Sequence, residues 1–175
     1  ASGEDIVALT DSQEISLICE RAGVGFHWNK DLRFTSLDIV AEMRDLLGEL
    51  ARRYEHCVIL RASCPLLTWV DVEDAWKKYL EAGADSLVTV KSVRQRIWNV
   101  RGDSLESLLD SAGGTDGGEE QFLVESRALI ILRLALLRES ADATPAPVLS
   151  AGHPPVRHPG KVIPYFLNER SIEIQ

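Results

Sequence analysis

Charged side chains stand at the ends of two short apolar runs. Asp11 comes just after the run Ile6–Leu9, and Arg61 directly follows Cys57–Leu60. Because open α/β sheets bind ligands at the carboxyl ends of their strands, both residues are candidates for ligand binding. The guanidinium of Arg61 can bind a sugar carboxylate through two parallel hydrogen bonds. The alternatives are a helix cap for Asp11 and a structural ion pair for Arg61.

A basic group follows the apolar run Ser86–Val90 and consists of Lys91, Arg94 and Arg96. Such a group can receive an acidic sugar or a phosphate, although a solvated face is the commoner role. The spacing of serine, cysteine and histidine residues shows no nucleophile with its base, so the sequence gives no support for covalent catalysis.

Composition limits the class of protein. The 175 residues are 45% hydrophobic and 26% charged, which is typical of a soluble globular chain with one domain. The net charge of −8 argues against nucleic acid as a partner. No apolar run reaches 18 residues, so we expect no membrane partner. Three cysteines without a C-x-x-C pair predict reduced thiols, at least two of them buried, in a cytoplasmic protein.

Hydrophobic periodicity predicts an alternation of strands and helices in the first half. Expected strands cover 6–10, 24–28, 57–60 and 86–90, and expected helices cover 13–21, 37–50 and 69–81. Asp11 or Ser12 would cap the first helix, and Thr68 with Asp71 resembles a capping box for the third. This order predicts an α/β fold with a mostly parallel sheet between two layers of helices.

The second half is less regular. We expect a strand at 96–100 with a turn at 101–103, a core strand at 122–132, and edge strands at 162–166 and 172–174. Pro164 is compatible with an edge strand, where a missing N–H is tolerated. The glycine-rich stretch 111–120 and the proline-rich stretch 143–160 are expected to be loops.

Four segments resemble motifs of the acylneuraminate and related CMP-sugar cytidylyltransferases. Asp5–Ile15 resembles V-V-S-T-D-D-x-x-I, and Val58–Leu67 resembles L-L-Q-P-T-S-P-L-R. Ala82–Val90 resembles S-G-A-D-S-V-V-S-V, and Arg170–Gln175 resembles S-I-D-I-D. The segments follow the same order over nearly the whole chain, so the resemblance implies a single domain over 1–175 with a nucleotide-diphospho-sugar-transferase-like fold.

The resemblance also implies an activity. Members of this family transfer CMP from CTP to an α-keto acid sugar with Mg²⁺, and they are commonly dimers in which an arm of one subunit reaches the other's active site. Together with the strand-end residues it gives the candidate substrate-binding residues Asp11, Arg61, Ser63, Arg94 and Ser126. Glu173 is the candidate ligand of Mg²⁺.

The sequence departs from the family where phosphate and metal should bind. Nothing before Asp5 supplies the family's glycine- and Arg/Lys-rich loop, which holds the CTP phosphates. Glu173 and Gln175 replace two aspartates of the closing motif, and Arg61 replaces a substrate-contacting glutamine. Ser126–Arg127 replaces the Asn–Gly of the family strand E-N-G-A-I-Y.

These departures leave three hypotheses. The first is a non-catalytic or weakly active cytidylyltransferase-like domain, a homodimer that binds a nucleotide or an acidic sugar. The second is an active CMP-sugar synthetase whose N-terminal loop is missing from this chain. The third is an assembly module of a larger protein. The substitutions at Glu173 and Gln175 favour a degenerate site, because truncation would not change them.

Overall fold

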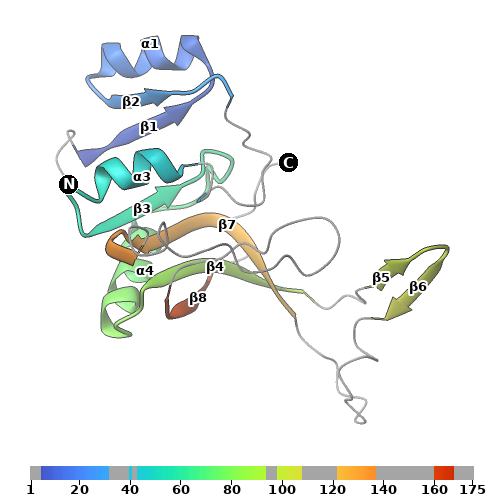
Figure 1. The fold of residues 1–175 in the computed structure, drawn as a ribbon. Coiled ribbons are helices and arrows are strands. Elements are labelled where there is room, and N and C mark those ends of the chain that lie inside the picture. Colours follow the sequence, from blue (N-terminus) through green and yellow to red (C-terminus); the bar gives the residue numbers. More distant parts are fainter. Residues whose placement is uncertain are drawn as a thin grey trace. The chain divides into compact units, whose positions relative to one another are not determined.

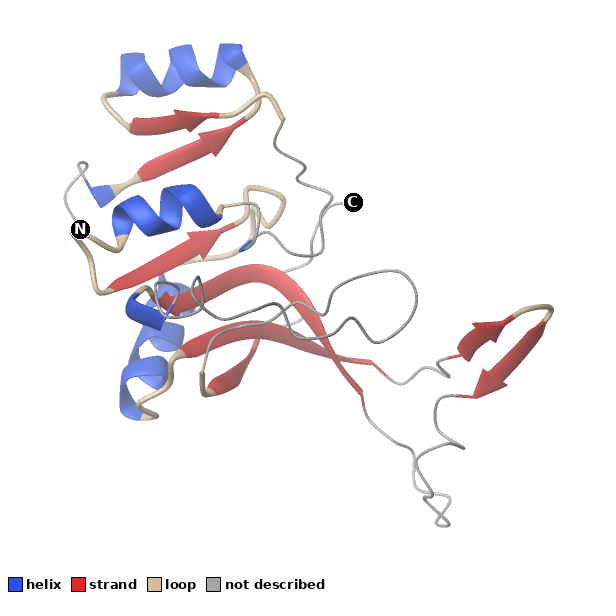
Figure 2. Ribbon diagram, viewed as in Figure 1, coloured by secondary structure: helices blue, strands red, loops and turns tan. Residues whose placement is uncertain are grey.

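The computed structural model describes residues 5–31, 40, 43–93, 98–107, 122–136 and 160–167 (Figures 1 and 2). The described elements are β1 (Val7–Thr10), α1 (Gln13–Ala22), β2 (Gly25–Trp28), α3 (Arg44–Leu50), β3 (His56–Leu60), α4 (Trp69–Glu81), β4 (Ser86–Val93), β5 (Trp98–Arg101), β6 (Ser104–Ser107), β7 (Phe122–Arg133) and β8 (Val162–Phe166). The chain divides into two compact units, residues 1–57 with 133–159 and residues 58–132 with 160–175.

In the first unit, β1, α1 and β2 form a βαβ unit with parallel strands, as the sequence predicts. Ser12 caps α1, since its Oγ accepts a hydrogen bond from the amide of Ile15 at 3.4 Å. The helix ends at Gly23, whose φ of 67° is in the left-handed region that glycine adopts readily. The cap is therefore Ser12 and not Asp11.

Helix α3 covers the last part of the long helix predicted at 37–50, but it begins at Arg44 after a turn at Met43, so the prediction of one continuous helix is wrong. The structure describes residue 40 and residues from 43 onward in this stretch. The predicted apolar face is buried there, at Val40, Met43, Leu46 and Leu47. This part of the prediction is confirmed, and the remainder of the stretch lies outside the described residues.

The larger sheet has the strand order β3–β7–β4–β8. Strands β4 and β8 are parallel, whereas β7 is antiparallel to β4. The predicted mostly parallel sheet is therefore wrong, although the α/β class is confirmed. The prediction placed a crossover between successive strands, but an antiparallel strand such as β7 needs none. Strand β8, which carries Pro164, lies at the edge of the sheet as predicted.

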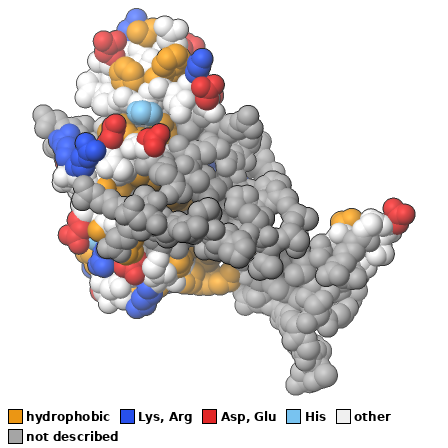
Figure 3. Space-filling model, viewed as in Figure 1, with side chains coloured by type: hydrophobic (Ala, Val, Ile, Leu, Met, Phe, Trp, Pro, Cys, Tyr) orange, Lys and Arg blue, Asp and Glu red, His pale blue; other side chains and the backbone are white. Residues whose placement is uncertain are grey.

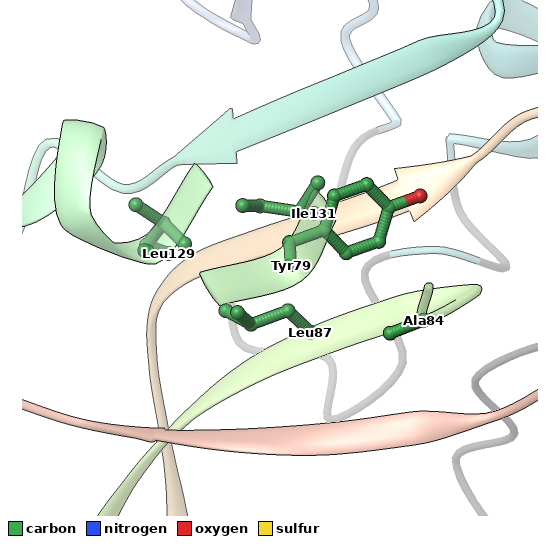
Figure 4. Close-up of a cluster of buried hydrophobic side chains, with 6 residues drawn as sticks. Tyr79, Ala84, Leu87, Leu129 and Ile131 are labelled. Carbon is green, nitrogen blue, oxygen red and sulfur yellow. The ribbon is translucent and has the colours of Figure 1, made fainter. Parts of the chain in front are cut away.

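The main core lies between α4 and the strands β4 and β7. Tyr79, Leu87, Leu129 and Ile131 gather there and are at most 1% exposed (Figure 4). The predicted capping box of α4 is present, with Asp71 accepting from the backbone amide of Thr68 at 2.8 Å. None of the helices in the described ranges is long and apolar enough to cross a membrane.

Strands β5 and β6 form an antiparallel hairpin that pairs Val100 with Leu105. Gly102 in its turn has a φ of 61°. The predicted strand and turn are thus found here, with β5 beginning at Trp98 among the described residues. The expected loops at 111–120 and 143–159 and the expected strand at 172–174 lie outside the described residues.

All three cysteines are free thiols, with Cys19 and Cys64 buried and Cys57 half-buried. The predicted burial of at least two of them is confirmed.

Candidate functional site

The β4–β7 pair contains a large bulge in β7. Val88 is opposite Ile130, but Val90, two residues later on β4, is opposite Glu125, five residues earlier on β7. Strand β7 therefore carries three residues more than β4 in this interval. Bulges of this kind release backbone from a ladder and redirect side chains, and they are common next to binding sites.

Thr89 stands opposite the bulge and is fully buried. Its Oγ1 donates a hydrogen bond to the carbonyl oxygen of Leu129 at 3.0 Å and accepts one from the amide of Leu129 at 3.1 Å. Within the bulge, Arg127 has a φ of 55°. This left-handed conformation is strained for a residue with a side chain, and such strain concentrates at functional sites.

Strand β3 brings Arg61 to the same bulge. The amide of Arg61 donates to the carbonyl of Ala128 at 3.1 Å, and the amide of Leu134 donates to the carbonyl of Glu55 at 2.9 Å. Six residues along β3 thus correspond to six residues backward along β7, so the two strands are antiparallel. Beyond this point both segments leave the ladder: the amide of Cys64 donates to the carbonyl of Arg61 at 3.1 Å, which closes a turn that contains Ser63, and Ser126 lies in the bulge of β7.

Ser63 and Ser126 share an unusual feature. The Oγ atom of each is buried and has no hydrogen-bond partner among the described residues. A buried hydroxyl without a partner destabilises the fold by about 1–3 kcal/mol, and most buried polar atoms are paired. Each hydroxyl can still donate one hydrogen bond and accept others from a ligand.

Charged residues are close to the two serines in the sequence. Arg61 is two residues before Ser63, and Glu125 and Arg127 flank Ser126. All three are half-buried and take part in further interactions. A guanidinium can bind a carboxylate through two parallel hydrogen bonds, and each serine hydroxyl can bind a ligand oxygen.

The structure does not place every predicted site residue with this group. Arg61, Ser63 and Ser126 belong to the second compact unit, whereas Asp11 is an exposed residue of the first. The backbone carbonyl of Asp11 accepts a hydrogen bond from Nε1 of Trp28 at 3.2 Å. Arg94 and Glu173 lie outside the described residues.

The described part of the chain contains no cluster of three or more His, Cys, Asp or Glu residues that could hold a metal ion. The predicted Mg²⁺ site depends on Glu173 and stays a prediction, and we derive no step through the ion. Burial raises the pKa of the Cys57 thiol to about 11. This thiol is thus protonated at neutral pH and is a poor nucleophile.

Sequence reasoning missed two features of the site. One is the hydroxyl of Thr89, the single polar residue in the apolar run from Leu87 to Val90. The other is the left-handed backbone at Arg127, which the glycine at the corresponding position of the motif E-N-G-A-I-Y, to which this segment was compared, could have indicated.

No protein-family model matches the sequence, and no curated protein matches it either. The functional assignment therefore rests on the residues and their geometry.

Proposed function

We propose that this chain is a cytidylyltransferase-like domain, non-catalytic or weakly active, that binds an acidic sugar or a nucleotide beside the β7 bulge. The conformation of Arg127 supports the family. The motif E-N-G-A-I-Y aligns its glycine with Arg127, and the backbone there has a φ of 55°. Glycine adopts this conformation without a steric penalty, so sequence motif and backbone agree at this position.

The two buried hydroxyls carry the proposal of a binding site. Ser63 and Ser126 have buried Oγ atoms without partners among the described residues. A ligand hydroxyl or carboxylate that bonds to them would offset this unfavourable burial. Arg61 follows β3, and its amide donates to the carbonyl of Ala128. A guanidinium pairs with a carboxylate more strongly than with an uncharged group, so we expect a sugar acid as the ligand.

The positions at which this sequence differs from the family motifs argue for weak or absent catalysis. CMP transfer from CTP requires donors and positive charge around the triphosphate, together with Mg²⁺. Gln175 offers one neutral carbonyl oxygen where the family has a carboxylate. Glu173 would be the remaining Mg²⁺ ligand in an active form of the enzyme. We therefore propose ligand binding, and not catalytic turnover, as the main function of the domain.

Calorimetric titration tests the binding. The wild-type protein is titrated with an N-acylneuraminate, with CMP, and with CTP in the presence of Mg²⁺. We expect binding of the acidic sugar at millimolar concentration or below, with a higher melting temperature at saturation. Arg61→Gln removes a charge-assisted bond and should weaken binding about tenfold or more.

Lys77→Gln is the matched control, because Lys77 is an exposed cation on α4 in the same compact unit. It removes the same charge and should leave the affinity unchanged. No binding of any of the three ligands at 10 mM, roughly −2.7 kcal/mol on the affinity scale, would refute the proposal. Pyrophosphate release from CTP with an α-keto acid sugar would show that the domain is an active synthetase instead.

Assembly is a second candidate function, and exposed apolar residues favour it. Val100 and Leu105 of the β5–β6 hairpin are 69% and 61% exposed. On α1, Ile15, Leu17 and Ile18 are also exposed, and Figure 3 shows hydrophobic side chains at the surface over this helix. A two-stranded hairpin alone is marginally stable in water, and exposed apolar patches mark interaction sites. We propose that the chain forms a homodimer through such residues.

Light scattering after size-exclusion chromatography tests the dimer. We expect a dimer at tens of micromolar and a shift toward monomer in Val100→Asp, which places a charge in an apolar contact. Lys77→Asp introduces the same aspartate outside the hairpin and should leave the dimer intact. A strict monomer at this concentration would contradict the assembly function.

A further inference from the structure

We infer that Thr89 is a positioning residue, whose hydroxyl holds the β7 bulge in the conformation that brings Ser126 to the binding site. The ligand in this inference rests on the proposed function. The geometry of the bulge does not, because it follows from the register and the hydrogen bonds of the two strands.

The register shows which bonds the hydroxyl replaces. Before the bulge, each step forward on β4 corresponds to one step backward on β7, from Ser86 opposite Leu132 to Val88 opposite Ile130. Continuing this pattern would place Thr89 opposite Leu129. There, however, the Thr89 side chain binds both the amide and the carbonyl of Leu129. The Thr89 hydroxyl thus makes the two hydrogen bonds that the backbone N–H and C=O of a strand residue usually make.

The bulge is held at two adjacent residues. Leu129 is bound by Thr89, and the carbonyl of Ala128 is bound by the amide of Arg61. The next residue toward the amino terminus is Arg127, with its φ of 55°, and Ser126 precedes it. Fixing both Leu129 and Ala128 limits how the strained turn at Arg127 can relax. The orientation of Ser126 therefore depends on the Thr89 hydroxyl.

Few side chains can bind both the amide and the carbonyl of Leu129 from the position of Thr89. The oxygen must donate one hydrogen bond and accept another within a site that is closed to water, and only a hydroxyl does both from one atom at this distance from the backbone. Threonine also suits the middle of a strand, because its branched Cβ favours extended backbone. Valine has nearly the same shape and neither function. Serine keeps the hydroxyl and loses the methyl group.

The test compares Thr89→Val with Thr89→Ser by nuclear magnetic resonance and calorimetry. In the valine variant we expect the amide of Leu129 to exchange at least about tenfold faster, since its acceptor is gone. We also expect shifted backbone signals at Ser126 and Arg127 and about tenfold weaker binding of the N-acylneuraminate. Thr89→Ser should retain the wild-type exchange rate, signals and affinity. A purely structural contribution of the side chain's volume would predict the reverse order of the two variants.

A measurement on the wild-type protein keeps the inference testable if Thr89→Val does not fold. A hydroxyl proton of Thr89 that is protected from exchange, with a nuclear Overhauser effect to the Leu129 amide, is the expected result. Its absence, or an unchanged Leu129 exchange rate in a folded Thr89→Val, would overturn the inference. If the wild-type protein binds none of the ligands, the proposed function fails, while the Leu129 exchange rate still decides the role of Thr89.

Discussion

The two halves of the β4–β7 pair differ in the regularity of their ladder and in whether their polar groups have hydrogen-bond partners. In the half from Ser86 to Val88, the ladder is regular and the side chains are buried, with Leu87 packed in the core beneath α4. In the half beyond Thr89, β7 bulges, Arg127 takes a left-handed conformation, and the hydroxyl of Ser126 is buried without a partner among the described residues. We call these the regular half and the bulged half.

The difference indicates that the two halves of this strand pair have different roles. The regular half contributes stability through apolar burial. The bulged half retains strain and a hydroxyl without a partner among the described residues, and features of this kind cluster at functional sites. Substitutions that simplify the side chain should therefore destabilise the regular half and stabilise the bulged half.

Leu87→Ala should give the largest effect. Leu87 is fully buried, and its truncation leaves a cavity in the core, so we expect a loss of about 3 kcal/mol in the free energy of unfolding. Urea denaturation followed by circular dichroism measures this. Leu80→Ala is the control, because Leu80 is 52% exposed on α4 and should change stability by roughly 0.5 kcal/mol or less. Equal losses in the two variants would mean that the regular half is not the main source of stability.

Arg127→Gly should act in the opposite direction. Glycine adopts a φ of 55° without the Cβ clash, so we expect a gain of about 1–2 kcal/mol in the free energy of unfolding. The same change removes the guanidinium of the residue that follows Ser126, and binding of an acidic sugar should weaken. The pair of denaturation and titration curves measures both effects. A loss of stability would show that the contacts of the Arg127 side chain outweigh the backbone strain.

Much of the regular half, and of the helix α4 that packs on it, could be predicted from the sequence. Thr68 and Asp71 predict the cap of α4, and the apolar run from Ser86 predicts β4, because both depend on neighbours within a few residues. The strand at 122–132 was also predictable from its apolar residues. Its antiparallel direction was not, because direction depends on which strands pair over long sequence distances.

The candidate site was predictable only in part. Arg61 was a candidate because it follows an apolar run, and Ser126 was a candidate because its segment was compared with the motif E-N-G-A-I-Y. The pairing of Arg61 with Ala128 depends on the β3–β7 register, which no local pattern of either segment encodes. The three additional residues in β7 were not predicted either, because the polar run Glu125–Arg127 interrupts the apolar strand without indicating by itself that the strand bulges.

The pH dependence of stability tests whether the thiol of Cys57 in β3 is buried. Burial raises the pKa of Cys57 to about 11, whereas an exposed thiol has a pKa of about 8.5 in the unfolded chain. Between these values the unfolded chain has released the proton and the folded protein keeps it. Rising pH therefore favours unfolding, by up to about 1.4 kcal/mol for each pH unit. Cys57→Ala should show a shallower decline from pH 8.5 to 11 in urea denaturation, and parallel declines would disprove the burial of this thiol.

Ser126→Ala should give the smallest effect and the most direct comparison. The change removes a buried hydroxyl that has no partner among the described residues, so stability should rise by up to about 1 kcal/mol. Ser12→Ala is the matched control, because the Ser12 hydroxyl accepts from the amide of Ile15 and caps α1. Losing that cap should lower stability by about 1 kcal/mol. The same atom is deleted in both variants, and opposite signs in urea denaturation are expected because the Ser12 hydroxyl has a partner and the Ser126 hydroxyl has none among the described residues. If Ser126→Ala instead destabilises the protein as Ser12→Ala does, its hydroxyl is already satisfied, and no ligand is needed to explain its burial.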